Sequence, residues 1–163
     1  MPASNDPGLP GRSPTEAASE RLEFRRFDTL SGAEVHALLR LRQDVFVVEQ
    51  DCAFAEIDGR DPGALHLLAW AGERLAGCLR LLAEEDAMRI GRIVVGAPAR
   101  GPGLGHRLLA AALDRCAATA PGRAVVLSAQ AHLENFYAAH GFIVVSSAYL
   151  EDGILHVDMR RPG

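Results

Sequence analysis

One short segment of the chain combines glycines with a following helical pattern, an arrangement that suits a phosphate group. It reads Arg-Gly-Pro-Gly-Leu-Gly over residues 100–105. Glycines let a ligand approach the backbone closely, and the free N–H groups and dipole of a helix N-terminus favour negative charge. The alternative is a plain strand-to-helix turn, because Gly-Pro-Gly is also good turn chemistry. A Walker loop is excluded because no Gly-Lys-Ser/Thr follows, and a dinucleotide-binding Gly-x-Gly-x-x-Gly fits poorly.

The composition removes several other classes of chemistry. All 17 basic residues of the 163-residue chain are arginine, so mechanisms that need a lysine, such as Schiff-base formation, are excluded. The net charge of −4 gives no sign of a nucleic-acid partner. The six histidines and three cysteines show no metal-ligand spacing, so no metal is expected. An odd number of cysteines argues against a disulfide framework and fits a reducing cytoplasm.

The elements that must position the glycine segment follow a mixed α/β pattern. Ser31 and Glu34 have the spacing of a capping box at the start of a helix. Helical spacing of apolar residues predicts helices over 32–48, 104–116 and 132–140. Apolar runs predict strands over 21–27, 64–71, 74–82, 88–95, 124–129, 142–150 and 154–160. The last two strands should form a hairpin, and the fold class is a single α/β (α+β) domain with one mixed central sheet.

The first 20 residues differ in composition from the rest of the chain. Residues 1–20 are rich in Pro, Gly, Ser and Ala, which predicts a flexible N-terminal tail before a domain over residues 21–163. The tail lacks the apolar run of a signal peptide, and no later stretch is apolar enough to span a bilayer. We therefore expect a cytoplasmic protein without a membrane partner.

In this order and spacing, the segments resemble the GNAT superfamily of acyl-CoA-dependent N-acetyltransferases. Arg100, Gly103 and Gly105 match the family's Arg/Gln-x-x-Gly-x-Gly/Ala signature. Residues 136–142, Phe-Tyr-Ala-Ala-His-Gly-Phe, match its second motif, in which a short helix carries a tyrosine. The segments over 39–52 and 55–70 look like the ElaA-like branch, so the resemblance covers nearly everything from about Leu22 onward. It implies a GNAT-like domain with about six to seven strands, splayed between the fourth and fifth and flanked by helices.

The resemblance also implies how acetyl-CoA would be held. Backbone of the strand before the signature would bind the acyl carbonyl and the pantetheine amides, as a strand partner would. The pyrophosphate would lie on backbone amides at the start of the following helix. Gln130 takes the place of an asparagine that the family often has seven residues before the tyrosine. The residues expected at this site are Ile93, Val94, Val95, Arg100, Gly101, Gly103, Leu104, Gly105, His106 and Gln130.

The implied reaction is acyl transfer from a thioester to an amine, with Tyr137 as the general acid. The alternative for Tyr137 is a core aromatic whose hydroxyl finds a partner. Several family members carry a basic glutamate on a central strand, but residues 89–95 and 125–129 contain no acid. The candidates for the base are Glu49, Asp58, His66 and His156, besides a chain of waters. Glu49 is favoured because it ends the first helix, where a negative charge opposes the dipole.

The loop over residues 49–61 carries five acids against Arg60 alone. Such a loop is predicted to steer a cationic acceptor, either a small-molecule amine or a protein lysine; a solvated loop is the alternative. Residues 42–46, Arg-Gln-Asp-Val-Phe, faintly resemble acyl-homoserine-lactone synthases, which is a second enzymatic interpretation. A third is a sensor that binds acyl-CoA without turnover, since the strands bear no base. A homodimer is left open.

Overall fold

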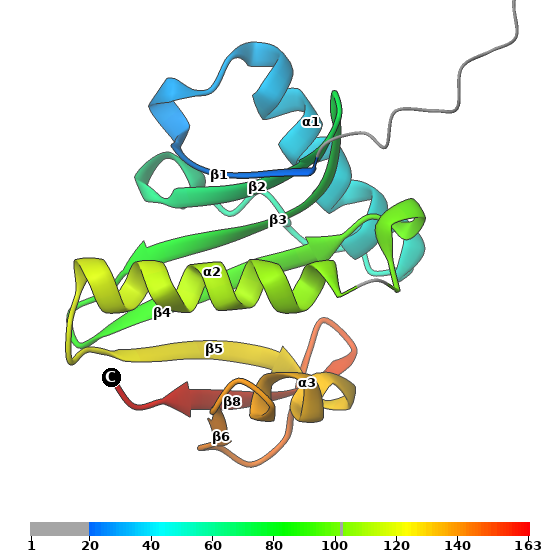
Figure 1. Cartoon of the computed structure of the whole chain (residues 1–163). Coiled ribbons are helices and arrows are strands. Elements are labelled where there is room, and N and C mark those ends of the chain that lie inside the picture. Colours follow the sequence, from blue (N-terminus) through cyan, green and yellow to red (C-terminus); the bar gives the residue numbers. More distant parts are fainter. Residues whose placement is uncertain (1–19, 102) are drawn as a thin grey trace, which may run out of the picture.

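The computed structural model of the chain describes residues 20–101 and 103–163 (Figure 1). Residues 1–19, which make up most of the predicted tail, and Pro102 lie outside the described residues. Glu20, which was predicted to belong to the tail, begins the first strand. Its carboxylate lies 2.7 Å from the guanidinium of Arg107. The first strand therefore begins one residue before the predicted domain boundary.

An eight-stranded mixed sheet organises the described chain (Figure 1). The strands run in the order β1-β2-β3-β4-β5-β8-β6, and β7 pairs with β8. All neighbours are antiparallel except β4 and β5, which are parallel. The bounds are β1 (Glu20–Arg26), β2 (Leu65–Ala71), β3 (Arg74–Ala83), β4 (Ala87–Val95), β5 (Ala124–Gln130), β6 (Ile143–Val144), β7 (Tyr149–Glu151) and β8 (Ile154–Arg161). The predicted mixed sheet is confirmed.

Helices cover both faces of this sheet. One face, the α2 face, carries α2 (Leu104–Thr119) and α3 (Glu134–Ala138). The other, the α1 face, carries α1 (Gly32–Arg42) and the π-helix η2 (Gln43–Glu49). Leu67 packs with the α2 cluster and Leu68 with the α1 cluster, because successive strand residues point to opposite faces. Short 3₁₀ turns fill four connections: η1 (Phe27–Thr29), η3 (Asp61–Gly63), η4 (Ala97–Ala99) and η5 (Ala131–Leu133).

Burial along α2 shows what holds the sheet and the helix together. Leu108, Leu109 and Ala112 of this helix are fully buried against the sheet. Each fully buried leucine side chain is worth about 1.5–3 kcal/mol of hydrophobic transfer free energy. The helix is therefore fixed firmly, and its N-terminus is held beside the end of β4.

The first helix starts as predicted but changes its winding. The hydroxyl of Ser31 accepts from the N–H of Glu34 at 3.2 Å, and the Glu34 carboxylate accepts from the N–H of Ser31 at 2.7 Å. This confirms the capping box. The helix was predicted to run to about Val48, but it widens from Gln43 into seven residues of π-helix. Such π segments are rare and occur mostly as single turns, often at functional sites.

The C-terminal hairpin departs from the prediction in its first arm. A single strand was predicted over 142–150, whereas the structure has two short strands, β6 and β7, with an irregular stretch between them. In that stretch the backbone N–H of Val145 donates to the carbonyl of Asp158, and the hydroxyl of Ser146 accepts from the N–H of Asp158. A side-chain hydroxyl thus replaces a ladder partner and interrupts the strand.

Candidate active site

The parallel strands β4 and β5 pair over a short stretch and then diverge. Their register pairs residues 87–89 with residues 124–126, and no pairing continues beyond. This confirms the predicted splay between the fourth and fifth strands. A cavity of about 1010 Å³ occupies the opening and is lined by residues from η2, β4, β5, α3 and the β7–β8 hairpin. The edge of β4 from Ile90 to Val95 lines this cavity without a strand partner on that side, so its polar groups can pair with an extended ligand.

A β-bulge bends β4 within this edge. Cys78 of β3 lies opposite Val94, but Arg80 lies opposite Gly91, so β4 carries an additional residue. Arg92 takes up the bulge with a left-handed φ of +53°. Bulges redirect side chains and leave ladder groups unpaired, and they are common beside active sites. No residue pattern predicted this bulge, because arginine is not a residue that favours a positive φ.

The glycine segment forms an open cradle at the start of α2. Gly101 and Gly103 have left-handed φ values of +109° and +83°, and Gly103 is the N-cap of the helix. No side chain caps this end, so the N–H groups of its first turn have no capping partner. A Cβ at Gly105 would lie 3.6 Å from Phe136, whereas one at Gly101 would meet nothing within 4 Å. The described part of the loop therefore offers glycine backbone and uncapped N–H groups, and phosphate binding there stays a prediction.

The favoured base, Glu49, is engaged by the signature arginine. Its two carboxylate oxygens lie 2.7 Å and 2.9 Å from the terminal nitrogens of Arg100. Arg100 also donates from Nε to the carbonyl of Val95 at 3.1 Å. The hydrogen bond from Arg100 lowers the pKa of the Glu49 carboxyl. The pair joins the end of η2 to the end of β4, and a carboxylate held in this way is a weak proton acceptor.

Tyr137 lies at the cavity on a short helix that follows β5. The side chain is buried, and its ring makes edge contacts with Phe136 and Phe142. Burial raises the pKa of its hydroxyl to about 12. The described residues offer the hydroxyl no hydrogen-bond partner, and Tyr137 lines the cavity. The hydroxyl therefore stays protonated at neutral pH and is available as a proton donor.

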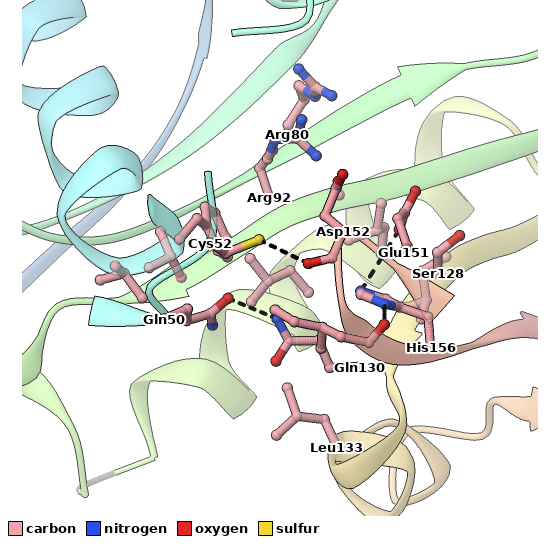
Figure 2. Close-up of a pocket in the computed structure, with 18 of the residues that line it drawn as sticks. Gln50, Cys52, Arg80, Arg92, Ser128, Gln130, Leu133, Glu151, Asp152 and His156 are labelled. Atoms are coloured by element: carbon pink, nitrogen blue, oxygen red, sulfur yellow. Dashed lines mark hydrogen bonds and ion pairs between the residues drawn. The ribbon is translucent and has the colours of Figure 1, made fainter. Parts of the chain in front are cut away.

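Two contacts cross the cavity from the loop after η2 (Figure 2). Gln130 donates from Nε2 to the side-chain oxygen of Gln50 at 3.0 Å, and Cys52 donates from Sγ to the carbonyl of Asp152 at 3.3 Å. Gln130 was predicted to bind pantetheine, whereas Gln50, Cys52 and Asp152 were not predicted to line the site. They come from segments far apart in the sequence, so local patterns could not identify them.

His106 occupies the first turn of α2, as predicted, but its side chain faces α3. Its Nδ1 lies 2.8 Å from Nε2 of His140, and the two rings are stacked. Phe136 packs against both rings. The predicted contribution of His106 to the cradle is therefore restricted to its backbone N–H.

The acidic loop is neutralised, contrary to its predicted excess of free charge. Three of its acids join three arginines in what we call the ion-pair network. Asp61 is buried, with its carboxylate 2.7 Å from Arg42, and Asp58 lies 2.6 Å from Arg80. Hydrogen bonding from Arg80 lowers the pKa of the Asp58 carboxyl. The network consists of Arg42, Glu56, Asp58, Asp61, Arg80 and Arg92.

The other candidate bases lie in different environments. The Asp58 carboxylate is engaged by Arg80, as described above. His66 is fully buried, donates from Nε2 to the carbonyl of Asp61 at 3.1 Å, and does not line the cavity. Burial lowers its pKa. His156 does line the cavity.

Residues 29–162 match the family model of the acetyltransferase (GNAT) domain. The chain belongs to the GNAT family. It is 42% identical over 137 residues to the protein ElaA of Escherichia coli K12, across 81% of this chain and 90% of ElaA. The crystal structure of E. coli ElaA superposes with a TM-score of 0.83 at 38% identity, over 88% of this chain and 99% of that one. The crystal structure of an acyl-CoA N-acyltransferase from Pseudomonas aeruginosa superposes with a TM-score of 0.84 at 43% identity, over 88% of this chain and 99% of that one.

Membership of the GNAT family makes the chain an acyltransferase that uses acyl-CoA, and the relatives place it in the ElaA-like branch. Over residues 20–101 and 103–163, no helix has the length and apolar character needed to cross a membrane. The same residues hold no group of three or more His, Cys, Asp or Glu side chains placed to bind a metal.

Proposed function

We propose that the chain is an acetyl-CoA-dependent N-acetyltransferase that transfers the acetyl group directly to an amine. The observation that carries this proposal is the opening between β4 and β5. It brings the unpaired edge of β4, the uncapped N-terminus of α2 and the protonated hydroxyl of Tyr137 to one cavity. The acceptor is a small-molecule amine or a protein lysine.

The donor half of the site is supported by backbone groups. The edge of β4 over residues 93–95 pairs with the pantetheine amides, and the backbone N–H groups of Gly101 and of residues 103–106 surround the pyrophosphate. Gln130 is placed to hydrogen-bond the pantetheine once its contact with Gln50 opens. Acetyl-CoA, when bound, supplies an acyl group activated as a thioester.

Tyr137 supplies the proton that the leaving sulfur needs. Its raised pKa keeps the hydroxyl protonated at neutral pH, and general acid catalysis of this kind contributes about 10²–10⁴-fold. An N–H of Val94 or Val95, on the cavity side of β4, would stabilise the oxyanion that forms on the carbonyl. Glu49, predicted as the base, stays a prediction, and its pairing with Arg100 counts against it.

Two measurements test the proposal. Binding to the native state alone should make CoA raise the melting temperature in a concentration-dependent way. Acetyl-CoA with a panel of primary amines should release free thiol and yield acetylated amine in equal amounts, and acetyl-CoA without an amine is the control. A protein that binds CoA but acetylates no amine would be an acyl-CoA sensor, and one that does neither would contradict the proposal entirely.

A further inference from the structure

His156 approaches the cavity from the sheet face opposite Tyr137. Val157 of β8 packs in the core cluster of the α2 face, together with Tyr137. Because strand residues alternate, His156 lies on the α1 face, where it pairs in register with Gln130 of β5. A thioester lying between the splayed strands would thus have a proton donor on one face and an imidazole on the other.

The ring of His156 is held in one tautomer. Its Nδ1 lies 2.8 Å from the carbonyl oxygen of Ile154, which can only accept, so Nδ1 carries the hydrogen. Nε2 then presents a lone pair. Among the described residues its nearest charged neighbour is the Glu151 carboxylate, at 3.7 Å, which is beyond hydrogen-bond distance. The side chain is only 12% exposed, and it stacks on Tyr149.

The groups that face this ring are acidic. β7 and its turn contribute Glu151, Asp152 and Tyr149, and β8 contributes Asp158, which accepts hydrogen bonds from Tyr149 at 2.8 Å and from the hydroxyl of Ser128 on β5 at 2.8 Å. The carboxylate of Glu151 is 56% exposed and has no arginine partner among the described residues. Figure 2 shows Glu151 beside His156 at the cavity. The carboxylate of Glu151 therefore favours a cationic ammonium group here.

We propose that His156 is the general base for the acceptor amine and that Glu151 orients the incoming ammonium group and stabilises the imidazolium. This inference rests on the proposed function. Nε2 removes one proton from the ammonium nitrogen. The freed lone pair forms a C–N bond to the thioester carbon, and the carbonyl electron pair moves to oxygen. When the carbonyl re-forms, the C–S bond breaks and the thiolate takes the proton of Tyr137.

Two protons remain to be transferred after the C–S bond breaks: one on the new amide nitrogen and one on His156. The new amide nitrogen loses its remaining additional proton, which restores the Tyr137 hydroxyl through solvent. His156 releases its proton to water. The net change is one amide, one free thiol and one proton from an ammonium ion and a thioester.

The first test observes the tautomer directly in the wild-type protein. Long-range ¹H–¹⁵N NMR of the His156 ring at a pH where it is neutral should show hydrogen on Nδ1 and none on Nε2. His156→Gln assigns the signal by its loss. A ring with hydrogen on Nε2 would overturn the proposal, because that nitrogen could not then accept a proton.

The second test measures catalysis with alkylamines as acceptors. His156→Gln should lower kcat by about 10²-fold or more and remove the acid-side inflection from the pH profile of kcat/KM, while the dissociation constant of CoA stays unchanged. Aromatic amines, already neutral at pH 7, should lose less activity than alkylamines in this variant. Glu151→Gln should cause a smaller loss, mainly in KM. His36→Gln, on the exposed side of α1 away from the cavity, is the matched control and should behave as wild type.

The outcomes separate this inference from the proposed function. A wild-type protein that acetylates amines while His156→Gln keeps both its rate and its pH profile would overturn the role of His156 and leave the acetyltransferase standing. A wild-type protein that acetylates no amine would remove the proposed function and this inference together.

Discussion

The glycine segment at the start of α2 and the ion-pair network on the α1 face line the same cleft but are built by different means. The first presents backbone: two glycines with positive φ and a helix end without a side-chain cap. The second is made of side chains, including Arg42 and Asp61, which are both nearly inaccessible to solvent. The shape of the glycine segment depends on the backbone conformations that glycine allows. The shape of the network depends on ion pairs between residues that are far apart in the sequence.

The comparison shows why one region leaves a local signature in the sequence, whereas the pairing of charges in the other does not. A backbone cradle needs only glycines at fixed spacing, so it leaves a signature in the sequence. A charged network needs each partner, and removing one leaves a buried charge unpaired. The glycine cradle can therefore be predicted from a local motif, whereas the pairing of the network's charges becomes visible only in the structure.

Tyr137 is the proton donor of the proposed reaction, so replacing it should have the largest effect on activity. Tyr137→Phe retains the ring contacts with Phe136 and Phe142 but removes the proton donor. We expect kcat for amine acetylation to fall by about 10²–10⁴-fold with the CoA dissociation constant unchanged. Steady-state kinetics and CoA titration measure the two quantities. An unchanged kcat under conditions where chemistry limits the rate would reduce Tyr137 to a core aromatic.

Removing Arg42, the central cation of the ion-pair network, should have an effect of nearly the same size, but on the free energy of unfolding instead of on activity. Arg42 donates to Glu56 and Asp61 at 2.7 Å each, and Arg42→Met leaves both buried carboxylates without it. Breaking a buried pair on one side costs about 3–5 kcal/mol, which urea unfolding would detect. Arg26→Met breaks an exposed pair with Asp28 and should leave the free energy of unfolding unchanged, which makes it the control. A loss no greater than that of the control would show that the network does not hold this side of the cleft.

Local signals in the sequence predicted local structure well. Ser31 and Glu34 form the expected capping box, Gly103 is the N-cap of α2, and the last hairpin turns at Asp152 and Gly153. Each of these depends on residues within four positions of one another. The splay between β4 and β5 was also foreseen, but from the family resemblance rather than from any local pattern.

The parts that the sequence did not predict depend on long-range contacts. Arg92 lies 36 residues from Glu56, and Gln50 lies 80 residues from Gln130, so no spacing rule relates them. Counting acids in the loop over 49–61 suggested free negative charge, because the arginines that neutralise it stand on other elements. The π-helical winding of η2 likewise has no known residue pattern, since its run of valine and phenylalanine is compatible with strand or helix.

The backbone cradle can be disturbed at a single glycine with a more limited effect. Gly103→Val places a β-branched side chain at a φ of +83°, a left-handed conformation that costs about 1–2 kcal/mol for residues other than glycine. We expect the loop to shift and the affinity for CoA to fall by at least roughly tenfold, while the ion-pair network stays intact and the melting temperature without ligand falls by about 2–8 °C. Isothermal titration with CoA measures the affinity. Wild-type affinity in a folded variant would show that the phosphates lie elsewhere.

The smallest effect is expected at Asp51, the one acid of the 49–61 loop that has no ion pair within the described residues. Asp51→Asn removes its charge and keeps a residue that tolerates its left-handed φ of +49°. If the network has already neutralised the loop, kcat/KM for a cationic amine should change by less than about twofold. Wild type and variant should also show the same dependence on ionic strength, because exposed charges are screened over a Debye length of ~10 Å at 0.1 M salt. Kinetics between low and high salt measure this slope. A steep fall of kcat/KM in Asp51→Asn at low salt, disappearing at high salt, would restore electrostatic steering by the loop and weaken the contrast drawn between the two regions.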